Sequence, residues 1–113
     1  MIVGGGSAGL VLIKEMLTSD KIAYKPVCIA DDDPTKLGNY ISGVKVAGST
    51  YDVKQLAEKY RVEEIFVTMP AASKKIQSAV IDRCKDCKCP VKVLPGVYQI
   101  ADGQVTVSKL RKV

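Results

Sequence analysis

The residues of this chain whose spacing favours a particular chemistry are the glycines of its first turn. Gly4, Gly6 and Gly9 fit the pattern G-x-G-x-x-G within the opening MIVGGGSAGL. Between a strand and a helix, the first glycine permits a tight turn, the second lets the backbone approach a pyrophosphate, and the third lets the helix pack against the strand. The helix start, with Ser7 and Ala8, adds free N–H groups and a partial positive charge. The pattern predicts a phosphate-binding turn, but glycine-rich starts match it easily, so its context decides.

An acidic cluster after the next apolar segment supplies that context. Asp31 lies 22 positions after Gly9, close to the roughly 20 at which an acidic residue accepts hydrogen bonds from the ribose of a dinucleotide. Asp31 and Asp32 are the candidates for that role. With Asp33 they form three consecutive acids that would repel a 2′-phosphate, so the sequence favours NAD over NADP as cofactor. Two alternatives stay open. The glycines could serve only to form a short turn in a fold that binds no ligand, and Asp33-Pro34 could serve only to start a turn.

The elements that must position these residues alternate along the chain. Apolar segments predict strands, and helical periodicities, with caps at Ser49 and Ser73, predict helices. The expected strands are Met1–Val3, Pro26–Ala30, Val44–Ala47, Glu64–Thr68 and Val91–Leu94. This alternation is typical of the α/β class: a doubly wound, Rossmann-like parallel sheet with helices on both faces and strand order 3-2-1-4-5. That order creates a crevice at the carboxyl ends of strands 1 and 4, so Met69 and Pro70, which follow strand 4, join the candidate site.

Apolar side chains at helical spacing predict the buried faces. The first helix, Ser7–Thr18, is apolar all round, and the other two carry one stripe each. The members are Leu10, Val11, Ile13, Met16 and Leu17; then Val53, Leu56, Ala57 and Tyr60; then Ile76, Val80, Cys84 and Cys87. Lys36–Gly43 is expected to be a loop or a short helical turn. In the tail, Asp102-Gly103 predicts a turn and Val105–Val107 alternates like a strand.

Length and composition bound the class of protein. With 113 residues, 47% hydrophobic and 26% charged, residues 1–113 are expected to form one domain. No apolar run approaches the roughly 20 residues of a membrane span, and nothing resembles a signal peptide. Only three residues precede Gly4, fewer than the about 5–6 of a typical strand, which suggests a fragment of a longer protein.

Several enzyme classes are excluded. The chain has no histidine, which removes Ser-His and Cys-His nucleophile pairs. The Y-x-x-x-K pair of short-chain dehydrogenases and sugar-nucleotide dehydratases is absent too, because Tyr51 and Lys54 are one residue too close together. Glu63 and Glu64 precede a strand and are expected to face solvent. No catalytic residue is therefore predicted.

The cysteines and the net charge leave alternatives open. Cys28, Cys84, Cys87 and Cys89 are interpreted as core thiols in a reducing cytosol, with zinc binding and redox function as alternatives; no metal is expected.

The net charge of +5 comes from the second half of the chain. It is interpreted as a solvated helix face and basic tail, or as an attraction to an anionic membrane surface or partner. No nucleic acid is expected.

Four blocks of the chain together resemble a known family. They are IVGGGSAG, IADDDPTKLGNYISGVKVAGS, VEEIFVTMPAAS and VKVLPGVYQIADGQVTVSKLRKV, and they cover essentially the whole chain. They are similar to the N-terminal nucleotide-binding domain of bacterial membrane-associated polysaccharide-biosynthesis proteins, the CapD-like UDP-sugar 4,6-dehydratase and epimerase family of capsule and O-antigen pathways. The D-D-D-P block and the V-L-P-G tail carry this resemblance more specifically than the glycines do.

The resemblance implies a role within a larger enzyme. In that family the domain follows transmembrane helices and precedes a catalytic domain that acts on UDP-linked N-acetyl sugars. It therefore implies a dinucleotide-binding domain that is not catalytic alone, with the catalytic domain and transmembrane segment as partners, at the cytoplasmic face of the bacterial inner membrane. Two alternatives stay open: a regulatory or interaction domain that binds another nucleotide, such as a CoA fragment, or none; and the equivalent domain of a membrane-bound sugar-phosphate transferase. A homo-oligomer is also compatible with the sequence.

Overall fold

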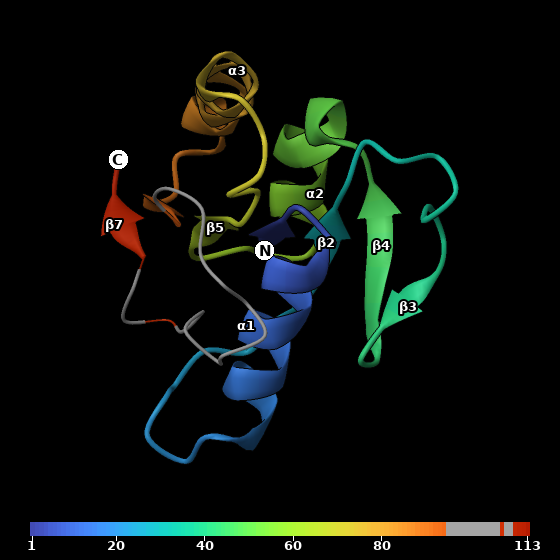
Figure 1. Cartoon of the computed structure of the whole chain (residues 1–113), viewed down its shortest axis with the longest axis vertical. Helices are drawn as coiled ribbons and strands as arrows, with labels where there is room; N and C mark the ends of the chain where they lie inside the picture. The colour runs from blue at the N-terminus through green and yellow to red at the C-terminus, as the bar shows by residue number, and fades with distance from the viewer. Residues whose placement is uncertain (95–106, 108–109) are drawn as a thin grey trace.

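A single mixed sheet organises the part of the chain that the computed structural model describes, residues 1–94, 107 and 110–113. Within those residues seven strands pair in the order β3-β4-β2-β1-β5-β6-β7, with β3 and β4 toward one side and β7 at the other (Figure 1). The strands are β1 (Ile2–Val3), β2 (Ile29–Ala30), β3 (Tyr40–Ile41), β4 (Val44–Gly48), β5 (Ile65–Val67), β6 (Val91–Val93) and β7 (Arg111–Lys112).

The five central strands, β4-β2-β1-β5-β6, are all parallel. They correspond to the predicted strands in the order 3-2-1-4-5, so the doubly wound α/β prediction is confirmed. β1 lies in the middle and pairs Ile2 with Ile29 of β2 and Phe66 of β5. The β1 carboxyl end, where the glycine turn begins, therefore lies between the ends of β2 and β5.

Two antiparallel edge strands were not predicted. The segment expected as a loop contains β3, which pairs with β4 through a two-residue turn. Both turn residues have positive φ, 48° at Ser42 and 82° at Gly43, the conformation that suits a tight hairpin to the twist of its strands. At the opposite edge β7 pairs with β6. The predicted turn at 102–103 lies outside the described residues, as do residues 105–106 of the predicted strand 105–107.

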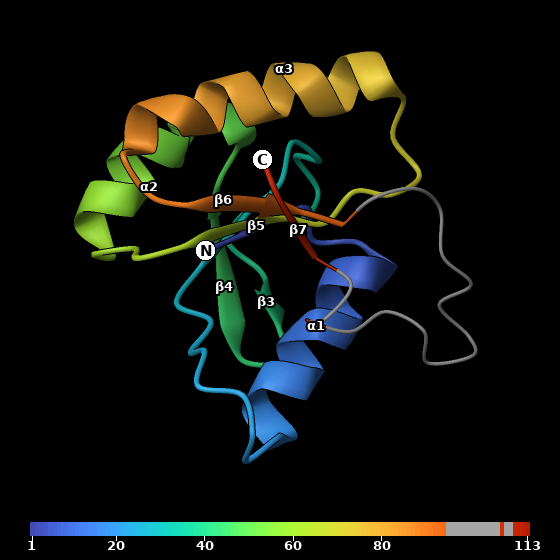
Figure 2. The same ribbon diagram turned by 90° about the vertical axis from the view of Figure 1, so that its left-hand side faces the viewer.

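The helices cover both faces of the sheet. α1 (Ser7–Thr18) lies on one face, and α2 (Val53–Lys59) and α3 (Lys74–Cys84) lie on the other (Figure 2). Successive residues of β1 serve the two faces: Ile2 packs with the α1 core, and Val3 with the α2 and α3 core. In the described residues, no helix has the length and apolar character needed to span a membrane.

Local capping signals are confirmed. Ser49 and Asp52 form a reciprocal capping box, although the helix opens with a 3-10 turn, η1 (Thr50–Asp52), before α2. The Ser73 hydroxyl accepts the Ile76 N–H at the start of α3. A second 3-10 turn, η2 (Lys85–Cys87), extends α3.

Some predicted packing is wrong. Leu17 and Ile76 are 54% and 53% exposed, because each lies on the side of its helix that faces away from the sheet. The strand expected from Pro26 begins only at Ile29. Glu64 is half-buried rather than solvated, with its Oε2 3.5 Å from the Lys92 Nζ.

Candidate functional site

A pocket of about 290 Å³ lies at the carboxyl ends of β1 and β5, where the doubly wound topology predicts a crevice,. Three segments converge there: the glycine turn with the start of α1, the segment after β2, and the segment after β5. The lining residues are Gly4, Gly6, Ser7, Ala8, Asp31, Lys36, Thr68, Met69, Pro70, Ala71 and Ala72. Of the nine predicted site residues, the structure brings seven together in this lining and leaves out Gly9 and Asp32.

The three glycines of the motif have different geometries. Gly4 has a φ of +108°, and a Cβ there would lie 2.6 Å from the carbonyl oxygen of Thr68. A Cβ on Gly9 would collide with the carbonyl oxygen of Gly4. Gly6, the N-cap of α1, has a φ of −83° that any residue adopts, and a Cβ there would have nothing within 4 Å. Thus Gly4 and Gly9 are required by the fold itself, whereas the space beside Gly6 is open to a ligand.

Thr68 holds the glycine turn in place. Its side chain is buried, and its Oγ1 donates a hydrogen bond to the carbonyl of Gly4 at 2.9 Å. The loop that follows is pinned by Gln77, whose Nε2 donates to the carbonyls of Met69 and Ala72. Sequence reasoning missed Thr68; the available signal was a hydroxyl residue at the end of strand 4, directly before Met69.

Asp31 spans the gap between β2 and the glycine turn. Its carboxylate accepts the Gly5 N–H at 2.6 Å and the Asp33 N–H at 2.8 Å. The Nζ of Lys36 lies 3.8 Å from the same carboxylate and donates to the carbonyl of Gly5 at 3.3 Å. Lys36 was not predicted as a site residue, because nothing in its local pattern indicates that its side chain reaches back over a turn 31 positions earlier.

Asp32 is directed away from the pocket. Its carboxylate accepts hydrogen bonds from the Thr50 N–H at 2.7 Å and from the Thr50 hydroxyl at 2.8–2.9 Å. Arg83 of α3 donates to the same hydroxyl at 2.8 Å. Asp32 therefore ties the segment after β2 to η1 and α3, and the predicted ribose contact is left to Asp31.

The groups around the pocket define its chemistry. The first N–H groups of α1 supply hydrogen-bond donors and a partial positive charge, Lys36 supplies a cation, and Asp31 supplies an acceptor. This set is suited to hold a phosphate and a hydroxylated group beside it. Over the described part of the chain, no cluster of three or more acidic or cysteine side chains is placed to hold a metal ion.

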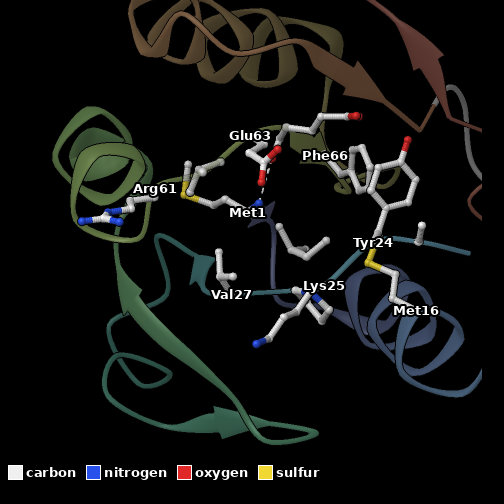
Figure 3. A pocket seen from close by; sticks show the side chains of 13 residues that line it. Met1, Met16, Tyr24, Lys25, Val27, Arg61, Glu63 and Phe66 are labelled. Atoms are coloured by element: carbon white, nitrogen blue, oxygen red, sulfur yellow. Dashed lines mark hydrogen bonds between the residues drawn. The ribbon is translucent and has the colours of Figure 1, made fainter.

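A second cavity, of about 300 Å³, lies at the opposite, amino ends of β1, β2 and β5 (Figure 3). Its walls include the Tyr24 and Phe66 rings, which meet edge to face at 4.9 Å. Lys92 donates to the Tyr24 hydroxyl at 3.1 Å, a bond that raises the pKa of the Lys92 ammonium. Ligands of doubly wound sheets bind at the carboxyl ends of the strands, so this cavity is not the candidate site.

Comparison with known proteins identifies the family of the chain. Residues 1–95, which include all of its lining, match a family described as a CoA-binding domain. The chain belongs to this family. The chain is also 32% identical over 114 residues to the capsular polysaccharide biosynthesis protein CapD of Staphylococcus aureus, and 25% identical over 113 residues to a probable polysaccharide biosynthesis protein, EpsC, of Bacillus subtilis.

Each of these matches covers the whole of this chain but only 19% of the relative's length. The resemblance to a domain of polysaccharide-biosynthesis proteins is thereby confirmed. Among solved structures, UDP-D-quinovosamine 4-dehydrogenase from Vibrio fischeri shares the fold, with a TM-score of 0.84 and 22% identity over 99% of this chain and 89% of that chain.

Proposed function

We propose that this domain is the nucleotide-binding module of a UDP-sugar 4,6-dehydratase or epimerase of bacterial polysaccharide biosynthesis, and that it is not catalytic alone. The observation that carries the proposal is the pocket beside Gly6, where three predicted segments converge and no side chain fills the space. The relatives CapD and EpsC, a capsular and a probable polysaccharide biosynthesis protein, support the pathway.

The proposed ligand is a nucleotide with an adenosine diphosphate moiety. NAD, which the sequence favours, and CoA, which the family description names, both contain this group. The N–H groups at the start of α1 would bind the diphosphate, with Gly6 allowing its close approach. Asp31 would accept from a ribose hydroxyl through the lone pairs that its two backbone contacts leave unused.

The larger context is part of the same proposal. A catalytic domain and a transmembrane segment would be the partners of this module in the full-length protein, at the cytoplasmic face of the inner membrane. A domain that binds no nucleotide and mediates interactions is the second candidate. It is favoured by one observation: Asp31 already accepts two backbone hydrogen bonds and faces Lys36.

Thermal unfolding with and without nucleotides tests the proposal. NAD, NADP, CoA, ADP and a UDP-sugar would each be added at millimolar concentration, since binding to the native state raises stability by mass action. We expect the adenine nucleotides to raise the melting temperature of the wild type. The Gly6→Ala variant is expected to unfold like the wild type without ligand and to lose the ligand response.

Ser78→Ala is the matched control, because Ser78 is exposed on α3 and does not line the pocket. It should keep the full response. No shift of the wild type with any of these nucleotides would favour the interaction domain instead. A shift with the UDP-sugar alone would overturn the assignment of an adenine nucleotide.

A further inference from the structure

We infer that Lys36 makes this pocket select nucleotides whose adenosine ribose carries an additional phosphate over otherwise identical nucleotides that lack it. The inference rests on the proposed function and names a specificity-determining residue within the same site. The shared chemistry is a phosphomonoester on the ribose, at the 2′ position as in NADP or at the 3′ position as in CoA.

The backbone that carries Lys36 is held firmly. The Lys36 N–H donates to the carbonyl of Asp33 at 3.1 Å. Two residues on, the Gly38 N–H donates to the carbonyl of Val46 at 2.9 Å, and the Val46 N–H donates back to Asn39 at 2.8 Å. The segment is therefore fastened to β4, and its lysine is presented from a defined position.

The side chain of Lys36 extends from this segment across the glycine turn. Its Nζ donates to the carbonyl of Gly5 at 3.3 Å and lies 3.8 Å from the Asp31 carboxylate. With 36% of its side chain exposed, Lys36 keeps ammonium hydrogens available to a further acceptor. Among the lining residues that the structure describes, Lys36 is the one basic side chain.

The three consecutive aspartates, Asp31, Asp32 and Asp33, do not all face Lys36 in the pocket, although their adjacency in the sequence suggests that they would. Asp32 is turned to Thr50. Asp33 accepts from the Thr35 N–H and hydroxyl at 3.0 and 2.7 Å, and these bonds lower the pKa of its carboxyl. Only Asp31 of the three lines the pocket, and it is offset by Lys36. Asp32 and Asp33 keep their charges, but their carboxylates are bound to Thr50 and Thr35 outside the pocket lining. The one acid in the described lining is paired with Lys36.

The position of Lys36 matches the place where a ribose phosphate would lie. In dinucleotide-binding folds an acid after the second strand binds the ribose hydroxyls, or a cation nearby accommodates a ribose phosphate. This pocket has both groups, since Asp31 and Lys36 line it together. A phosphate gains charge-assisted hydrogen bonds from an ammonium that a hydroxyl does not. For a partly exposed lysine we expect an affinity gain of about tenfold.

Two matched ligand pairs test the inference by isothermal titration calorimetry. CoA and dephospho-CoA differ only in the 3′-phosphate, and NADP and NAD only in the 2′-phosphate. We expect the wild type to bind the phosphorylated member of at least one pair about tenfold more tightly. Lys36→Gln should bring that ratio close to one while changing the affinity of the unphosphorylated member much less, and Lys36→Arg should retain the ratio.

Lys45→Gln is the control for net charge, since Lys45 is exposed on β4 and does not line the pocket; it should leave the ratio unchanged. Increasing salt should reduce the wild-type ratio. Equal affinities within both pairs, or a ratio that survives Lys36→Gln, would overturn the inference and leave the proposed function standing. Failure of all four nucleotides to bind would overturn the proposed function, and this inference with it.

Discussion

The three glycines of the G-x-G-x-x-G motif differ in how strictly the fold requires them. Gly4 needs a positive φ of +108° and close contact with Thr68, and Gly9 needs the absence of a Cβ against the carbonyl of Gly4. Gly6 satisfies neither condition, because its backbone is ordinary and its surroundings are open. A motif that looks uniform in sequence thus contains two glycines that the fold requires and one, Gly6, that the fold itself does not require.

This division predicts that alanine substitution destabilises the fold at Gly9 and has almost no effect at Gly6. Gly9→Ala should lower the free energy of unfolding by about 1–3 kcal/mol or more, because the helix must move away from the turn. Gly6→Ala should change it by less than about 0.5 kcal/mol. Urea denaturation of the two variants beside the wild type measures both. Equal destabilisation would show that the turn is not packed as described.

Two thiols behave as core side chains, as the sequence predicted. Cys28 and Cys84 are fully buried with the apolar residues of the α2 and α3 core. Burial raises the pKa of the Cys28 thiol from 9.0 to about 11 and that of Cys84 to about 12. Thiols held protonated in this way are weak nucleophiles and weak metal ligands.

Alkaline pH should therefore destabilise the fold. Above pH 9 the unfolded chain releases these two protons while the folded chain retains them, so stability falls as pH rises from about 9 toward 11. The free energy of unfolding from urea titrations at pH 7, 9 and 10.5 checks this. The double variant Cys28→Ala, Cys84→Ala should show a shallower decline, and an identical slope would assign the effect to other groups.

At the scale of elements, the contacts of Asp32 join three segments. Asp32 follows β2, its partner Thr50 opens η1, and Arg83 of α3 donates to the same threonine hydroxyl. Arg83 also donates to the Tyr51 hydroxyl at 2.8 Å, with its guanidinium 3.8 Å from the centre of that ring. The two neighbouring acids therefore bind different elements. Asp31 accepts a hydrogen bond from the glycine turn, whereas Asp32 connects the segment after β2 to the face of the sheet that α2 and α3 cover.

The two acids should respond differently to the same substitution. Asp32→Asn replaces one acceptor oxygen with a donor and should cost about 1–2 kcal/mol of stability, while the affinity for an adenine nucleotide stays within about twofold of the wild type once the protein is folded. Asp31→Asn should weaken the affinity for NAD, whose ribose hydroxyl loses its acceptor. It should also cost stability, because the Asp31 carboxylate accepts the Gly5 and Asp33 N–H groups. Calorimetric titration combined with thermal unfolding separates the two quantities; a nucleotide defect confined to Asp32→Asn would contradict the geometry.

For the molecule as a whole, the central strands of the sheet are more extensively hydrogen-bonded and covered than the edge strand β3. Hydrogen bonds hold β1 and its flanking residues on both sides. The Gly4 N–H donates to the carbonyl of Ala30 at 2.8 Å, the Phe66 N–H to that of Met1 at 2.9 Å, and the Thr68 N–H to that of Val3 at 2.8 Å. Helices cover both faces of these central strands (Figure 2). At the edge, β3 is two residues long, and its Tyr40 is 65% exposed.

Hydrogen exchange should follow this difference between centre and edge. The amides of Gly4, Phe66 and Thr68 are expected to exchange only through global unfolding, whereas those of Tyr40 and Ile41 should exchange through local opening of the hairpin. Exchange measured by NMR as a function of urea distinguishes the two regimes. Fast, urea-independent exchange at Thr68 would contradict a rigid turn at the site, and nucleotide binding should slow exchange in residues 4–9 before it affects β3.

The sequence by itself determined those features whose signals are local. Apolar runs and glycine turns indicated the five parallel strands and their order. The Ser49–Asp52 and Ser73 caps marked two helix starts, and the stripe Val53, Leu56 and Ala57 marked a buried face. The glycine motif and the segment after β5 indicated the pocket. Such signals act over a few residues, so no knowledge of the rest of the chain is needed to detect them.

Only the tertiary structure decided which groups meet across long separations. Lys36 reaches Gly5 from 31 positions away, Asp32 finds Thr50 18 positions on, and Thr68 supports Gly4 from 64 positions away. These contacts depend on the order in which strands pair and on the direction in which each side chain leaves its segment. Three adjacent aspartates therefore seemed equivalent in sequence, and packing assigned each a different partner and left one of them at the site.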